Sequence, residues 1–168
     1  YMTDEYAFFV DSGLTYDGAA TTSITGLDHL EGETVAVLAD GAVHPNRTVT
    51  SGAITLQLAA SVVNVGLPYV ATIKTMPIEA GAQDGTAQGK EQRINGIVLD
   101  LFETGAGLWY GPNTTDMDEY AVRSSGDAMD APVPLFTGQT DRLAWPGEYE
   151  KGTQMVVQHR LPLPCTVR

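Results

Sequence analysis

The clearest structural signal in the chain is the segment TVAVLADGAVHPNRTVT, residues 34–50. Its first six residues are apolar or β-branched, as in a buried strand. Asp40-Gly41 follows, a dipeptide that favours a type I′ turn because both central residues of that turn adopt positive φ. Residues 42–50 then form the partner strand, which closes at Ser51-Gly52. The segment therefore predicts an antiparallel hairpin.

The same strand pattern extends in both directions from this hairpin. Short apolar or alternating runs, broken by Gly, Pro, Asn or Asp, predict strands at 6–10, 21–25, 53–58, 62–65, 69–76, 94–103, 117–124, 133–137 and 153–161. Pro45 and Pro68 are expected at edges or bulges, since proline donates no ladder hydrogen bond. No long window has helical periodicity. We predict an all-β chain with little helix, built from short antiparallel strands in two small barrel-like or sandwich-like units.

The division between the two units is expected near residue 78. Residues 80–93 are rich in glycine and polar residues, including Gly81, Gly85 and Gly89, and predict a surface loop or one or two helical turns. The expected units are an N-terminal one over 1–78 and a C-terminal one over 79–168, packed on the first or intertwined with it.

Composition and charge limit the classes of function. The chain has 168 residues, is 43% hydrophobic and carries a net charge of −12, which fits a folded domain and opposes stable binding to nucleic acid. A single cysteine excludes a disulfide framework. No apolar run is long enough to span a bilayer, so membrane insertion is not expected. Because residue 1 is not Met and the last residues stop inside an expected strand, we expect a piece of a longer polypeptide.

Residues able to perform catalysis are few and scattered. His29, His44 and His159 lie in separate regions without zinc-ligand spacing. Cys165 is interpreted as a small buried hydrophobe; the alternative, a nucleophile, requires His159 or His44 beside it. Phosphate-binding loops and nucleophile elbows are missing from the sequence. We therefore predict no catalytic residue, no metal, no cofactor and no small-molecule substrate.

Two acidic clusters and two glycosylation sequons receive similarly plain interpretations. Residues 116–119 and 127–130 lack the calcium-loop pattern and are expected to be solvated turns. The sequons at Asn46 and Asn113 lack a secretory signal and are interpreted as chance. Trp109, Tyr110 and Trp145 stand beside turns, where aromatic rings serve either as a sugar-stacking platform or as core. The core interpretation is favoured, and these three residues are the candidate binding surface.

Two stretches resemble a family of bacteriophage virion proteins. The family occurs in phage and prophage structural-gene clusters, and some members carry a small β domain like the one inserted in ubiquitin-activating enzymes. The first stretch is GLDHLEGETVAVLADG (26–41), continuing through GAITL (52–56) to ASVVNVGLPY (60–69). The second comprises LFTG (135–138), WPG (145–147) and LPLPCTV (161–167).

This resemblance implies a structural module of a phage or prophage tail assembly protein. Its partners would be other virion proteins or copies of itself, and it would reside in the virion, and in the bacterial cytoplasm during assembly. The resemblance implies no catalytic residue at any position of this sequence. If the module lined a DNA channel, its negative charge would keep phosphates from adhering. The alternative from another class is a β-type binding module that recognises a cell-surface glycan or receptor through the three aromatic residues.

Overall fold

The computed structural model describes residues 8–79, 85–128 and 131–168. Every strand pair in these ranges is antiparallel, and the described helical structure is one 3-10 turn, η1 (Asp28–Leu30). The predicted all-β class with little helix is therefore confirmed. The described residues contain no helix long and apolar enough to cross a membrane.

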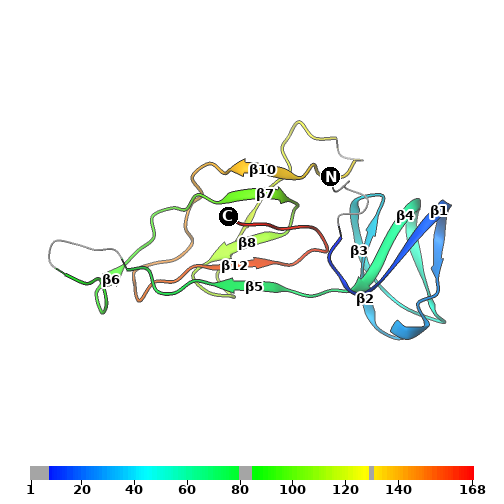
Figure 1. Ribbon diagram of the computed structural model, residues 1–168, viewed down its shortest axis with the longest axis horizontal. Coiled ribbons are helices and arrows are strands. Elements are labelled where there is room, and N and C mark those ends of the chain that lie inside the picture. Colours follow the sequence, from blue (N-terminus) through cyan, green and yellow to red (C-terminus); the bar gives the residue numbers. More distant parts are fainter. Residues whose placement is uncertain (1–7, 80–84, 129–130) are drawn as a thin grey trace.

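The N-terminal part is a four-stranded sheet with the order β1-β4-β2-β3 (Figure 1). Its strands are β1 (Asp11–Thr25), β2 (Thr34–Ala39), β3 (Ala42–Thr48) and β4 (Ala53–Leu67). The predicted hairpin is the β2–β3 pair, and Asp40 and Gly41 have φ of 47° and 79°, as a type I′ turn requires. Pro45 lies in β3, which is an edge strand, as expected.

Two strands of this sheet are longer than predicted. β1 starts at Asp11, although strand character was expected only at 21–25; the expected strand at 6–10 falls partly outside the described residues, and Phe8, Phe9 and Val10 are not in a strand. β4 is continuous where two strands were expected. The two long strands pair with each other, with register shifts, so β4 supplies the partner for a strand whose local signal is weak.

A compact apolar core lies against one face of this sheet. It comprises Ile24, Leu27, Leu30, Val35, Val37, Val49, Ile54, Leu56, Ala60, Val63 and Val65. η1 is attached to the turn before β4 by Glu31, whose carboxylate accepts N–H bonds from Ser51 and Gly52 at 2.8 and 2.7 Å. These two bonds lower the pKa of Glu31.

The C-terminal part contains a second four-stranded sheet with the order β5-β12-β8-β9. Its strands are β5 (Ala71–Lys74), β12 (Val156–His159), β8 (Leu108–Gly111) and β9 (Asp118–Tyr120). A further pair, β7 (Asp100–Thr104) with β10 (Phe136–Gln139), is extended by the C-terminal segment, where Leu101 forms a bridge with Val167. A short pair, β6 (Glu91–Gln92) with β11 (Glu150–Lys151), lies at the far end of the molecule (Figure 1).

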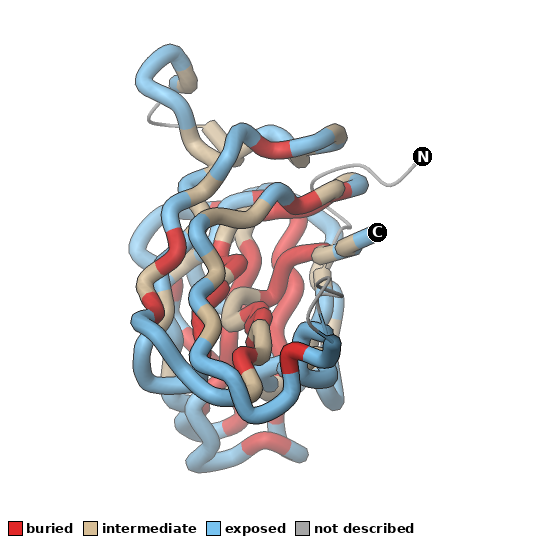
Figure 2. Tube along the Cα trace, turned by 90° about the vertical axis from the view of Figure 1, so that its left-hand side faces the viewer, coloured by how far each residue is buried: buried red, intermediate tan, exposed pale blue. Residues whose placement is uncertain are grey.

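These layers form a sandwich with its own small core. Leu99 and Leu101 from the β7 side meet Leu108 and Val157 from the four-stranded sheet. The buried segments accordingly lie inside the molecule with exposed segments around them (Figure 2). Both four-stranded sheets have two ends, so neither closes into a barrel, and the sandwich-like alternative is the one observed.

β5 joins the two parts of the chain. It follows β4 directly in the sequence, but its hydrogen-bonded partner is β12. The division predicted at residue 78 leaves β5 with the N-terminal unit, whereas its pairing attaches it to the C-terminal sheet. The predicted loop at 80–93 contains β6, and residues 80–84, including Gly81, lie outside the described residues.

Candidate functional site

The three aromatic residues of the candidate binding surface do not form a shared exposed platform. Tyr110 is buried in β8, and burial together with the nearby Asp118 charge raises its pKa. Trp145 is only 6% exposed, and its buried indole N–H lacks a hydrogen-bond partner among the described atoms. A Cβ on Gly147 would meet that indole nitrogen, so the neighbouring backbone covers it. Two of the three rings are therefore unavailable to stack on a sugar.

Trp109 is half-buried, and its ring face is occupied. The guanidinium of Arg160 lies 4.4 Å from the ring centroid, within the range of a cation–π contact. That guanidinium is held in place by Gln158, whose Oε1 accepts bonds from Nε and Nη2 at 3.0 and 2.8 Å. The indole is thus covered by a side chain of its own sheet.

The three histidines occupy separate environments. His29 is exposed and lies 3.2 Å from the carbonyl oxygen of Ser12 through Nε2. His44 accepts the N–H of Gln57 at Nε2, and its Nδ1 lies 2.7 Å from the carbonyl oxygen of Pro45. His159 is buried, and its Nε2 lies 3.0 Å from the carbonyl oxygen of Ala106. In the described part of the chain, no group of three or more His, Cys, Asp or Glu side chains is placed to hold a metal ion.

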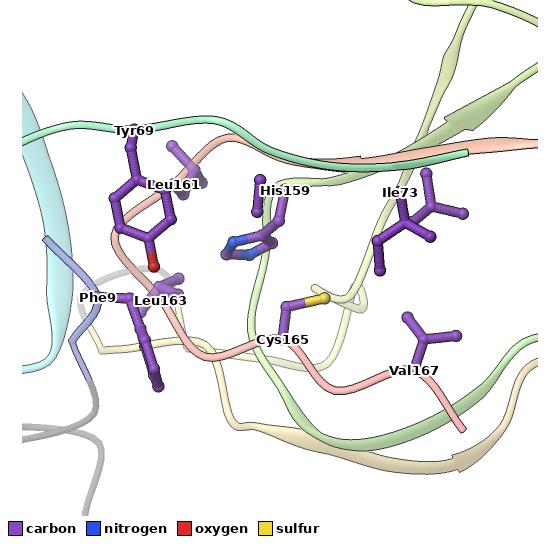
Figure 3. Close-up of a pocket in the computed structure, with 10 residues that line it drawn as sticks. Phe9, Tyr69, Ile73, His159, Leu161, Leu163, Cys165 and Val167 are labelled. Atoms are coloured by element: carbon purple, nitrogen blue, oxygen red, sulfur yellow. The ribbon is translucent and has the colours of Figure 1, made fainter. Parts of the chain in front are cut away.

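One cavity brings a histidine and the cysteine together. It lies between the β5–β12 face and the C-terminal segment and has a volume of about 120 Å³ (Figure 3). Its lining consists of Phe9, Tyr69, Ala71, Ile73, Val157, His159, Leu161, Leu163, Cys165 and Val167. Figure 3 shows the His159 ring and the Cys165 sulfur directed into the same apolar space.

The chemistry of this cavity does not match an activated nucleophile. Burial raises the pKa of Cys165 and lowers the pKa of His159, so both groups are stabilised in their neutral forms. A thiolate–imidazolium pair requires the opposite shifts. None of the described lining residues carries a carboxylate that could orient the imidazole. The cavity suits an apolar group better than a reacting one.

The second sequon and the described part of the second acidic cluster form turns, whereas Asp118 and Glu119 of the first cluster lie in β9, where a solvated turn was expected. Asn113 Oδ1 accepts bonds from Thr115 and from the N–H of Asp116, and so closes the turn before β9. Asp127 accepts the N–H of Ser124 at 2.7 Å. The end of the second cluster, residues 129–130, lies outside the described residues.

An open strand edge that the sequence did not predict is a prominent surface feature of the described residues. All four residues of β5 are exposed, and its outer edge pairs with no described strand. Ile73 is 62% exposed and Met76, just beyond the strand, 82%. Monomeric proteins usually protect such an edge with charge, proline or a covering loop. The strand was predicted from its sequence, but its place at an edge follows from pairing with β12, which no local pattern indicates.

Comparison with known proteins adds no identity: no protein-family model and no curated protein matches the chain.

Proposed function

We propose that this chain is a structural module of a bacteriophage or prophage virion, in a tail assembly, where it acts through contacts with copies of itself and with other virion proteins. The observation that carries the proposal is the exposed edge of β5. An edge strand whose outer side has no partner strand, with large exposed apolar side chains, is the type of surface that a subunit contact covers. A stiff β module with such an edge suits assembly by geometry.

The resemblance to virion proteins supports this role through the segments that it covers. The first stretch (26–41, 52–56 and 60–69) covers β2 with the turn that follows it and most of β4. The second includes most of β10 and the segment that borders β7. The resembling residues are therefore those of the framework, as expected for a protein whose function is its shape.

A binding module and an enzyme, the alternatives from other classes of function, find less support in the geometry. A glycan-binding module would present its aromatic rings to solvent, but Tyr110 and Trp145 are buried and Trp109 lies beneath Arg160. A hydrolase would bring an imidazole and an acid into one hollow. His159 lies in the apolar cavity without a carboxylate among the described lining residues. The proposal includes no cofactor and no small-molecule substrate.

The test is the composition of particles. Particles purified from a strain that carries the gene are analysed by mass spectrometry and by immunogold labelling with antibodies against this chain. We expect the chain in intact particles, in a constant ratio to the other virion proteins, with gold at the tail. Its absence from particles, or a ratio that falls steadily with further purification, would refute the virion role.

A further inference from the structure

The sheet β5-β12-β8-β9 has two open edges with complementary strand directions. β5 lies at one edge and β9 at the other, and neither outer side pairs with a described strand. Because the sheet has an even number of antiparallel strands, β9 runs opposite to β5. A second copy in the same orientation can therefore place its β5 beside β9 and continue the antiparallel alternation.

The main-chain groups at both edges are directed outward in matching phase. Successive residues of a strand direct their main-chain N–H and C=O groups alternately toward and away from a neighbouring strand. The Thr75 N–H binds the carbonyl oxygen of Met155 on the β12 side, so Thr72 and Lys74 direct their N–H and C=O groups away from β12. At the other edge, the Arg160 N–H binds the carbonyl oxygen of Gly107, so the next residue, Leu108, directs its main-chain groups toward β9 and its partner Tyr120. The neighbouring Glu119 therefore directs its main-chain groups outward.

The charges at the two edges are opposite. Residues 68–78, around β5, contain Lys74 and no acid, whereas residues 116–122, around β9, contain three acids and no Lys or Arg. The cross-strand pairs place Thr72 and Glu119 on one face of the sheet, and Lys74 lies on that same face by alternation. A chain of net charge −12 thus meets its copy where opposite charges face each other.

One register satisfies all of these conditions. With Glu119 opposite Lys74 of the next copy, both residues exchange main-chain bonds, and their side chains form an ion pair on one face. Tyr120 then lies opposite Ile73 and covers its exposed side chain on the other face. Met117 lies opposite Met76, the most exposed of the large apolar residues described. A shift of two residues would place Asp118 against Ile73.

We propose that copies of this chain associate head to tail, with β9 of one copy paired antiparallel to β5 of the next in the Glu119–Lys74 register. This inference rests on the proposed assembly role and specifies its contact. The interface joins two different surfaces, so it generates a ring if the rotation closes and a filament if it does not. The four-stranded sheets then form one continuous sheet across the assembly.

Charge reversal tests the contact in the full chain by sedimentation. Lys74→Glu alone, or Glu119→Lys alone, creates like-charged pairs at every contact, and we expect association weakened about tenfold, toward the 17.9 kDa monomer. An equimolar mixture of the two variants, and the double variant, restore opposite pairs and should associate like the wild type. Lys151→Glu and Glu148→Lys are exposed controls with the same charge changes, and they should have no effect.

Disulfide trapping tests the register in a Cys165→Ala background. Thr72→Cys with Ala121→Cys places two thiols on residues that face each other as a hydrogen-bonded pair of the proposed ladder. The Cα atoms of such a pair are about 5.5 Å apart, a distance that a disulfide can span. Within one copy the two edges are three strand spacings apart, roughly 14 Å, so a bridge must join different copies. We expect a ladder of cross-linked oligomers on oxidation. Thr72→Cys with Met117→Cys, four residues out of register, is the control and should form no disulfide-linked oligomers on oxidation.

The outcomes separate this contact from the virion role. Oxidised Thr72→Cys/Ala121→Cys protein that stays monomeric, or single charge reversals without effect, would overturn the head-to-tail contact. Cross-linking of the Thr72→Cys variant alone would indicate β5 pairing with β5 and would overturn it as well. A chain found in particles that fails these tests keeps its virion role and loses this contact. A chain absent from particles that nevertheless forms the ladder would show the reverse.

Discussion

Replacement of Arg160 by Ala should both destabilise the C-terminal sandwich and uncover Trp109. The guanidinium lies 4.4 Å from the indole centroid and donates two hydrogen bonds to Gln158 Oε1. A partly desolvated cation–π contact contributes about 0.5–2 kcal/mol, and hydrogen bonds of a charged donor add to it. We expect a loss of about 1–3 kcal/mol in the free energy of unfolding. The bond from the Arg160 main-chain N–H to Gly107 is retained, so the strand pairing should persist.

Urea unfolding and tryptophan quenching measure the two effects separately. The chain has two tryptophans, and Trp145 is 6% exposed, so a rise in acrylamide quenching of the folded Arg160→Ala protein reports Trp109. Arg93→Ala is the matched control: its guanidinium lies 6.0 Å from the ring of Tyr149, which is 68% exposed, and we expect a change under about 0.5 kcal/mol. Unchanged quenching with unchanged stability, or an equal loss in both variants, would refute the assigned role of Arg160.

Four further substitutions have definite expected outcomes. Because burial lowers the pKa of His159 below its ordinary 6.5, the folded state disfavours the protonated ring, and stability falls as the pH drops below about 6.5. His159→Gln should therefore make the urea midpoint less dependent on pH in that range. The lowered pKa of Glu31 contributes stability at pH values above its ordinary pKa of 4.5, and this stability is lost at lower pH. Glu31→Gln should therefore make the urea midpoint less dependent on pH at acid pH, and an unchanged dependence would contradict this. Gly111→Ala should cost about 1–3 kcal/mol in thermal or urea unfolding, because its Cβ would meet the carbonyl oxygen of Asp116. Gly32→Ala, with open space and φ of 81°, should cost about 1 kcal/mol, and a smaller loss at Gly111 than at Gly32 would refute the steric reasoning.

The sequence alone was sufficient for the β2–β3 hairpin and for the all-β class. Both depend on local chemistry: the Asp40-Gly41 turn requires positive φ at two adjacent residues, and the run before it has the β-branched composition of a buried strand. The edge position of Pro45 followed from its missing N–H for the same reason. Such features involve neighbours in the chain and need no knowledge of distant partners.

The tertiary structure alone decided where the strands lie and what they cover. β1 is poor in local strand signal and forms because β4, far along the chain, supplies its partner. The pairing of β5 with β12 left one edge open, and the bridge between the C-terminal segment and β7 brought Cys165 to the cavity that His159 lines. The periodicity of a strand predicts which side chains share a face. Which strand pairs with each of its edges depends on contacts between residues that are distant in the sequence.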